Sequence, residues 1–167
     1  MLEYSNYRAG DSGSTDLADN YSAAVRLIAR DSFVANQYYL DSFEHNDDTY
    51  VFRFNYKIND LSVIMSQELR EKTGMSSFIE VTVTKGKIDR YKKYSYRYVV
   101  SQKDTATATV DFINAVDGLY ARLYRNGVTK AVDNIALCYI AGNKSFGLSW
   151  IVDIEGTPYV VDTKAGD

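Results

Sequence analysis

The sequence predicts an α+β protein built from two tandem units, each a helix followed by an antiparallel three-stranded meander, with a hairpin added to the first. Its 15 Tyr and seven Phe, against a single Pro, favour β-sheet. A strand with large apolar residues, followed by a turn, occurs twice at an offset of 96 residues. In this repeat Phe52 corresponds to Leu148, and Ile58 corresponds to Ile154. A stretch with helical periodicity precedes each copy of this pattern.

The composition is typical of a soluble globular protein. Of the 167 residues, 46% are hydrophobic and 25% are charged, which suffices for one large core or two small ones. The net charge of −3 and the lack of a dense Lys/Arg block argue against binding to nucleic acid or to an anionic membrane. No apolar run approaches the roughly 20 residues that cross a bilayer, and no signal peptide is evident.

The first unit is expected over residues 14–100. It follows a stretch, residues 1–13, that lacks periodicity and is interpreted as a flexible leader or an expression remnant. The helix is predicted over 15–31, because Ser14 or Thr15 can cap its first turn. Apolar residues on one helical face are expected to pack on a sheet: Leu17, Tyr21, Ala24, Val25 and Ile28.

Three strands are predicted after this helix, over residues 36–44, 49–58 and 61–65, with Asn59-Asp60 as the turn between the last two. In the first strand, strict alternation puts Leu40 and Phe43 on opposite faces. In the second, Phe52 and Phe54 share one face. The polar run from His45 to Asp48 predicts a turn between them, which favours a solvated His45 over a metal ligand or an acid-base group.

The first unit then continues into an added hairpin. A helical turn or ordered loop is predicted over 67–72, and the hairpin strands are predicted over 78–84 and 87–100. Lys85-Gly86 is the expected turn between them. The alternation of the return strand slips once, and a β-bulge near Lys92-Lys93 would restore its phase.

The second unit is expected over residues 101–167. Asp104 or Thr105 is predicted to cap its helix, and Arg125-Asn126-Gly127 is predicted to close it. The apolar stripe of this helix is expected to consist of Val110, Ile113, Val116, Tyr120 and Leu123.

The chain is predicted to close with further antiparallel strands. The first covers roughly residues 129–141. The run 145–161 then contains two apolar strands joined at Glu155-Gly156, which is a hairpin pattern. This hairpin holds the only Trp and the only Pro of the chain.

No catalytic constellation is found in the sequence. With one His and one Cys, the chain lacks the cluster needed for a zinc site, and a Ser-His-Asp or Cys-His arrangement is not indicated. Cys138 lies in an apolar run and is expected to be a small buried group, and it cannot form an intrachain disulfide alone. No Gly-rich phosphate loop is present. We therefore expect a protein that is not an enzyme and holds no metal or cofactor.

A row of tyrosines is the candidate binding surface. Tyr94, Tyr96 and Tyr98 alternate along the return strand of the added hairpin, with Arg97 among them. Aromatic and cationic side chains together can anchor a protein partner or stack single-stranded bases, and the acidic net charge disfavours bases. The alternative is that these tyrosines form the half-buried face of a long strand.

The arrangement resembles the YycH/YycI family, which are extracytoplasmic regulators of the YycG/WalK sensor histidine kinase in Gram-positive bacteria. The resemblance covers roughly residues 16–166. It rests on four pieces in order: the aromatic strand pair Tyr50 to Ile64, the hairpin Phe78 to Ile88 running into the Tyr-rich strand, the helix ending in Gly118-Leu119-Tyr120, and a closing block of Ile135 to Tyr139, Leu148 to Val152 and Tyr159 to Gly166.

The resemblance implies tandem PepSY-like units outside the membrane, without enzyme activity. It implies control of a sensor histidine kinase through protein contacts, with a paralogous regulator as a possible second partner. The full-length protein would then be attached to the membrane by an N-terminal transmembrane helix absent from this chain. Two alternatives stay open: a PepSY-like inhibitor-type domain acting on an envelope protease or other enzyme, and a small-ligand pocket or enzyme in an NTF2-type fold.

Overall fold

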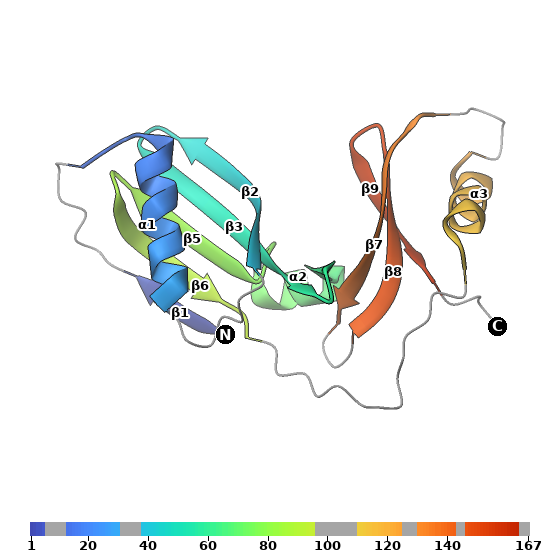
Figure 1. The fold of residues 1–167 in the computed structure, drawn as a ribbon, viewed down its shortest axis with the longest axis horizontal. Helices are drawn as coiled ribbons and strands as arrows, with labels where there is room; N and C mark the ends of the chain where they lie inside the picture. The colour runs from blue at the N-terminus through green and yellow to red at the C-terminus, as the bar shows by residue number, and fades with distance from the viewer. Residues whose placement is uncertain (6–12, 31–37, 96–109, 125–129, 143–145, 164–167) are drawn as a thin grey trace. The chain divides into compact units, whose positions relative to one another are not determined.

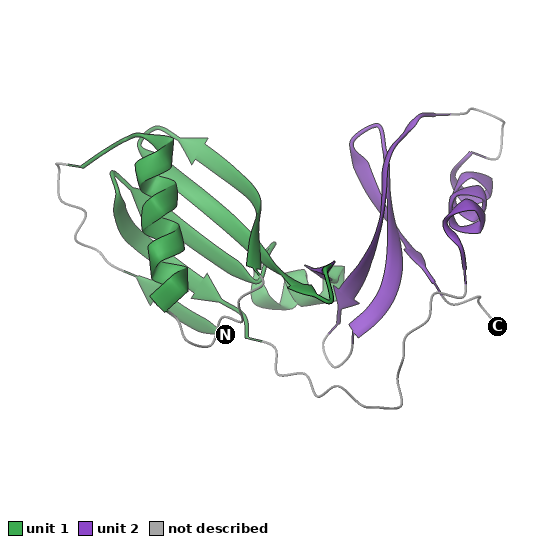
Figure 2. Cartoon of the chain, in the orientation of Figure 1, with its two compact units in different colours: residues 1–60, 65–98 green, residues 61–64, 99–167 purple. Residues whose placement is uncertain are grey.

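A computed structural model describes residues 1–5, 13–30, 38–95, 110–124, 130–142 and 146–163 (Figure 1). The chain divides into two compact units (Figure 2). Unit 1 comprises residues 1–60 and 65–98, and unit 2 comprises residues 61–64 and 99–167. Each contains antiparallel strands and a helix packed on them, which is the mixed α and β composition that the sequence predicts.

Unit 1 is a five-stranded antiparallel sheet with one long helix on one face (Figure 1). The strands lie in the order β1-β6-β5-β3-β2. Helix α1 packs against β5, β3 and β6. The elements of this unit are β1 (Leu2–Ser5), α1 (Leu17–Arg30), β2 (Tyr38–Asn46), β3 (Thr49–Ile58), α2 (Gln67–Thr73), β5 (Ile79–Thr84) and β6 (Lys87–Lys93).

The core of unit 1 lies between α1 and the central strands. Phe52 and Phe54 of β3 are fully buried, and they pair with Val81 and Ile79 of β5. The buried apolar residues of α1 are Ala24 and Ile28, and they complete this layer. Burial of this apolar stripe against the aromatic strand holds the helix on the sheet.

Three expectations for unit 1 are wrong. Residues 2–5, expected in a flexible leader, form β1 and pair with β6. The bulge in the hairpin lies at Asp89 and not near Lys92-Lys93. Arg90 pairs with Thr82 and Ile88 pairs with Val83, which leaves Asp89 between them without a partner in β5. His45 belongs to β2 and pairs with Tyr50, so the turn is shorter than predicted. In each case backbone pairing with a neighbouring strand overrides local polarity.

Unit 2 is a smaller antiparallel meander with one helix (Figure 2). Its strands lie in the order β4-β7-β8-β9, and α3 packs against β8 and β9. The core contains Leu119, Val152 and Ile154. The elements are β4 (Leu61–Met65, of which 61–64 belong to this unit), α3 (Phe112–Leu123), β7 (Val132–Ala141), β8 (Phe146–Ile154) and β9 (Thr157–Asp162).

The second helix differs from its prediction. Asp111 caps it, because its carboxylate accepts a hydrogen bond from the Asn114 N–H at 2.9 Å, whereas the predicted caps at 104 and 105 lie outside the described residues. Ala115 and Leu119 are its buried residues, while Ile113 is 58% exposed. Of the predicted stripe, Val116 and Tyr120 pack against the core as expected, whereas Ile113 and Leu123 are exposed. The predicted closing sequence 125–127 also lies outside the described residues.

Three hairpin turns are confirmed at the predicted positions. Both residues of each turn adopt a left-handed φ between 49° and 76°. Paired left-handed residues match the twist of two antiparallel strands, which explains why short polar pairs mark these turns in the sequence. The pairs are Asn59-Asp60, Lys85-Gly86 and Glu155-Gly156.

Candidate protein-binding surface

The predicted tyrosine row is only partly within the described structure. β6 ends at Lys93, and Tyr94 follows it as a half-buried residue. The Tyr94 N–H donates a hydrogen bond to the Phe78 carbonyl at 2.8 Å, which fixes the backbone beyond the strand. Tyr96, Arg97 and Tyr98 lie outside the described residues, so partner binding by this row stays a prediction.

A different aromatic surface lies on the face of the sheet that carries α1, over β2 and the neighbouring part of β3. The register of β2 shifts at Asp41, between Leu40 and Ser42. Leu40 therefore pairs with Phe54 and Phe43 pairs with Phe52, which puts Leu40 and Phe43 on the same face. Strict alternation predicts opposite faces, and the bulge is the reason that this prediction is wrong.

Helix α1 leaves this part of the sheet uncovered, because its main contacts are with β5, β3 and β6. Tyr21 lies over the sheet at the border, with its ring centroid 5.6 Å from that of Phe52 and 6.4 Å from that of Phe54. Phe43 reaches Phe52 from β2, at 6.1 Å. Tyr21 and Phe43 thus flank one buried ring from two elements.

Four large apolar residues here are exposed to solvent. Leu17 is 40% exposed, Tyr21 37%, Leu40 36% and Phe43 46%, and we call them together the β2 surface. The sequence predicts Leu17 and Tyr21 as buried stripe residues, and they lie instead at the margin of the helix interface. Exposed apolar residues that gather in one place mark contact surfaces more often than scattered ones do.

The outer edge of β2 adds hydrogen-bonding groups to this surface. Among the described strands, β2 pairs with β3 alone, so its other edge presents unpaired backbone groups. The other sheet edges are protected: β1 has four residues, and β9 contains Pro158. β2 has nine residues and contains no Pro or Lys, and the features that protect its edge are the bulge at Asp41 and the charges of Asp41 and Glu44.

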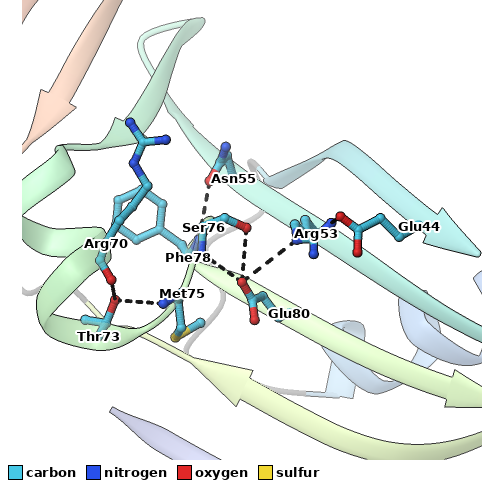
Figure 3. A network of polar contacts seen from close by, with 9 residues as sticks. All are labelled: Glu44, Arg53, Asn55, Arg70, Thr73, Met75, Ser76, Phe78 and Glu80. Carbon is cyan, nitrogen blue, oxygen red and sulfur yellow. Dashed lines mark hydrogen bonds and ion pairs between the residues drawn. The ribbon is translucent and has the colours of Figure 1, made fainter.

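On the face of this sheet opposite to α1, Arg53 forms ion pairs with two glutamates (Figure 3). Arg53 of β3 points toward Glu44 of β2, with 2.9 Å between the guanidinium and carboxylate, and toward Glu80 of β5, at 4.0 Å. The hydrogen bond from Arg53 and its positive charge lower the pKa of Glu44. These pairs hold β2 and β5 on either side of β3.

The same network fixes the segment between α2 and β5 (Figure 3). The Glu80 carboxylate accepts hydrogen bonds from the Ser76 N–H at 2.8 Å and from its hydroxyl at 3.2 Å. The Asn55 side-chain carbonyl accepts the Phe78 N–H at 3.3 Å. These contacts join β2, β3, β5 and the segment before β5, so the network acts as a structural brace, although the buried Nε of Arg53 has no hydrogen-bond partner among the described residues.

The two side chains considered for chemistry lie far from catalytic geometry. His45 stacks on Tyr50 with ring centroids 4.1 Å apart and an interplanar angle of 12°. Cys138 is buried, as predicted, and burial raises the pKa of its thiol to about 11. Within the described ranges, no group of three His, Cys, Asp or Glu side chains could hold a metal ion, and no helix is long and apolar enough to cross a membrane.

Comparison with known proteins gives one informative likeness. No family model matches the chain, and no curated protein gives a significant match. Among solved structures, the YpeB C-terminal domain from Bacillus megaterium is similar, with a TM-score of 0.54 and 12% sequence identity. The similarity covers 97% of this chain and 66% of that chain, slightly less than two thirds of its length. YpeB is a PepSY-containing protein, and at this identity the likeness concerns the fold alone.

Proposed function

We propose that this chain is a PepSY-like regulatory module that binds a protein partner through the β2 surface and performs no catalysis. The observation that carries this proposal is the combination of four exposed apolar side chains with a strand edge that none of the described strands covers. Aromatic anchors near an open edge fit recognition of an extended protein segment, since the edge supplies hydrogen bonds and the side chains supply apolar contact.

The tandem organisation is part of the proposal. The order helix, strand, strand, strand occurs as α1-β2-β3-β4 and again as α3-β7-β8-β9. β3 and β8 each end in a two-residue turn with left-handed residues, 96 residues apart at Ile58 and Ile154. The likeness to a PepSY-containing protein supports reading these as two PepSY-like units, with β5 and β6 as the hairpin added to the first.

The partner we propose is a sensor histidine kinase of the cell envelope or a paralogous regulator of it. This follows from the resemblance of the closing block to the YycH/YycI family. It requires an extracytoplasmic location, with attachment to the membrane through a segment outside this chain. The second candidate is inhibition of an envelope protease or other enzyme. The likeness to a PepSY-containing protein concerns the fold and does not distinguish this candidate from the first.

Affinity capture from envelope extracts, followed by mass spectrometry, tests the proposal. Wild-type chain is compared with Leu40→Ser and Phe43→Ser, which remove exposed apolar contacts from the β2 surface. Ile113→Ser is the matched control, because Ile113 is 58% exposed on a helix of the other unit. A partner retained by wild type and control, and lost from both β2 variants, supports the proposal. Equal retention by all four proteins contradicts it.

The identity of the captured protein separates the two candidates. A sensor histidine kinase or a paralogous regulator supports the first. A peptidase or another envelope enzyme supports the second. Circular dichroism of each variant must match wild type, so that lost binding reports on the surface and not on unfolding.

A further inference from the structure

A row of charges that alternates in sign crosses the sheet of unit 1 on the face opposite to α1. Glu3 of β1 lies opposite Lys92 of β6, and Lys92 lies opposite Glu80 of β5. Glu80 lies opposite Arg53 of β3, and Arg53 forms an ion pair with Glu44 of β2 at 2.9 Å (Figure 3). Opposite charges that face each other on neighbouring strands stabilise strand pairing. Each strand of this sheet therefore contributes one charge to the row.

The row ends in an acid at the edge that the described strands leave open. The side chain of Glu44 is 69% exposed. Residues 38–48, which comprise β2 and the turn after it, contain four carboxylates and no Lys or Arg. Ion pairs with cations of β3 and of the β5–β6 turn neutralise two of them. Asp41 and Asp47 are exposed and form no ion pair within the described part of the chain, so this edge is negatively charged.

The backbone of β2 fixes how an added strand would lie against this edge. Asn46 and Thr49 flank a two-residue turn and exchange their hydrogen bonds, so the next outward-facing backbone groups are those of His45 and Phe43. The side chains of these two residues lie on the face that carries α1, against buried aromatic rings of β3. An added antiparallel strand therefore places two side chains beside Phe43 and His45, and the side chain between them lies beside Glu44 on the other face.

We infer that the β2 surface binds an extended segment of a partner protein in which apolar residues alternate with Lys or Arg. This inference rests on the proposed function and specifies the chemistry of the partner. The apolar side chains of the segment contact Phe43 and Leu40, which are exposed. A cation between them lies beside Glu44 and continues the row of alternating charges.

The charges that protect this edge also determine which strand it accepts. Asp41 and Glu44 repel a segment that carries acids, and a segment without charge leaves them uncompensated. A second copy of β2 brings the same two acids to the edge, which disfavours self-pairing. A segment with Lys or Arg is attracted instead, and the negative edge also speeds its association.

Fluorescence anisotropy with short labelled peptides and the purified 167-residue chain tests this inference. In one peptide Val alternates with Lys, in the second Val alternates with Glu, and the third contains the Val and Lys residues in two separate blocks. The alternating Lys peptide should bind about tenfold more tightly than either of the others. Glu44→Gln should reduce the preference for Lys over Glu about threefold. Asp117→Asn is the matched control, because it removes one exposed negative charge from a helix of the other unit and should leave that preference unchanged.

Several results would overturn the inference. One is equal binding of the Lys and Glu peptides, and another is equal binding of the alternating and block peptides. Equal effects of Glu44→Gln and Asp117→Asn would do the same. Self-association of wild type in sedimentation velocity that Phe43→Ser abolishes would place a second copy on this edge and would also refute it.

The capture assay separates failure of this inference from failure of the proposed function. Glu44→Lys should lose the captured partner, and Asp117→Lys should retain it. If circular dichroism shows that Glu44→Lys is unfolded, the Glu44→Gln peptide titration decides. Capture that is lost in Phe43→Ser and complete in a folded Glu44→Lys refutes the inference alone. Selective binding of the alternating Lys peptide without any captured partner refutes the proposed function alone, and failure of both assays refutes both.

Discussion

Asn20 offers a direct test of how α1 is fixed beside the β2 surface. Its side chain is fully buried, although Asn is polar. The amide NH₂ group donates hydrogen bonds to the carbonyls of Ser14 at 3.1 Å and Asp16 at 2.7 Å. The amide oxygen accepts the Gly86 N–H at 2.9 Å, in the β5–β6 turn. One side chain therefore ties the start of α1 to a turn 66 residues away.

Asn20→Ala should lower the free energy of unfolding by about 3 kcal/mol. The change removes three partly buried hydrogen bonds, each with a net value of about 1 kcal/mol. Urea unfolding followed by far-UV circular dichroism measures the loss, since the single Trp150 lies in unit 2 and does not report on unit 1. The matched control is Asn114→Ala, because Asn114 is an exposed helical Asn.

The control should cost no more than about 1 kcal/mol, because it removes one exposed side-chain hydrogen bond to Asp111 and keeps the capping bond that the Asn114 backbone N–H donates. A loss below about 1 kcal/mol for Asn20→Ala would refute the assignment of Asn20 as the anchor of α1. So would equal losses in the two variants.

Asn20→Asp adds a dependence on pH with a definite sign. One carboxylate oxygen can still accept the Gly86 N–H, but the other faces the carbonyl oxygens of Ser14 and Asp16. Burial and these carbonyls favour the neutral acid, so the folded-state pKa of the new Asp should lie above its unfolded value. The variant should therefore be most stable at low pH and lose stability as pH rises through the folded-state pKa. Stability that rises with pH relative to wild type would contradict this reasoning.

Three further predictions concern other parts of the chain. Trp150 is half-buried and donates a hydrogen bond to the Val110 carbonyl at 2.9 Å, so Trp150→Ala should cost about 3 kcal/mol and Trp150→Phe about 1 kcal/mol in urea unfolding, whereas a Trp150→Phe variant as stable as wild type would exclude a role for this bond. Cys138, with a thiol pKa of about 11, should resist alkylation at neutral pH until urea unfolds the chain, and rapid labelling of folded protein would contradict its burial. Replacing Tyr94, Tyr96 and Tyr98 together by Ser should weaken partner capture if the predicted tyrosine row is an interface. Unchanged affinity in a folded triple variant would show that the row does not bind the partner.

The elements that depend on local chemistry are the ones that the sequence predicts well. β3 and β4 begin and end where the alternation and the Asn59-Asp60 turn place them. Gly74 ends α2 in a left-handed conformation, and the Glu155-Gly156 turn joins β8 to β9. In each case the residues that define the boundary are neighbours in the chain, so a short window contains the information.

Features set by distant pairing could not be predicted in the same way. The residues of β1 have no periodicity of their own, and they form a strand because β6 supplies its open edge. The bulge at Asp41 follows from how β2 fits β3, and the bulge at Asp89 from how β6 fits β5. A slip of one residue reverses the face of every later side chain, so these bulges change which residues become exposed.

The β2 surface is a consequence of such a slip. Without the bulge at Asp41, strict alternation would turn either Leu40 or Phe43 toward the polar face that carries Arg53, and the apolar row would be interrupted. With it, both side chains join Tyr21 around the buried rings of β3, while α1 lies over β5 and β6 and leaves them exposed. The proposed binding surface therefore exists because α1 packs on β5, β3 and β6 and does not extend over β2. A deletion of Asp41 leaves Leu40 and Phe43 two residues apart, so regular alternation keeps both on the face of Phe52 and Phe54. A folded deletion variant should therefore retain partner capture, whereas Phe43→Ser should not; loss of capture by the deletion variant would show that the bulge itself contributes to binding.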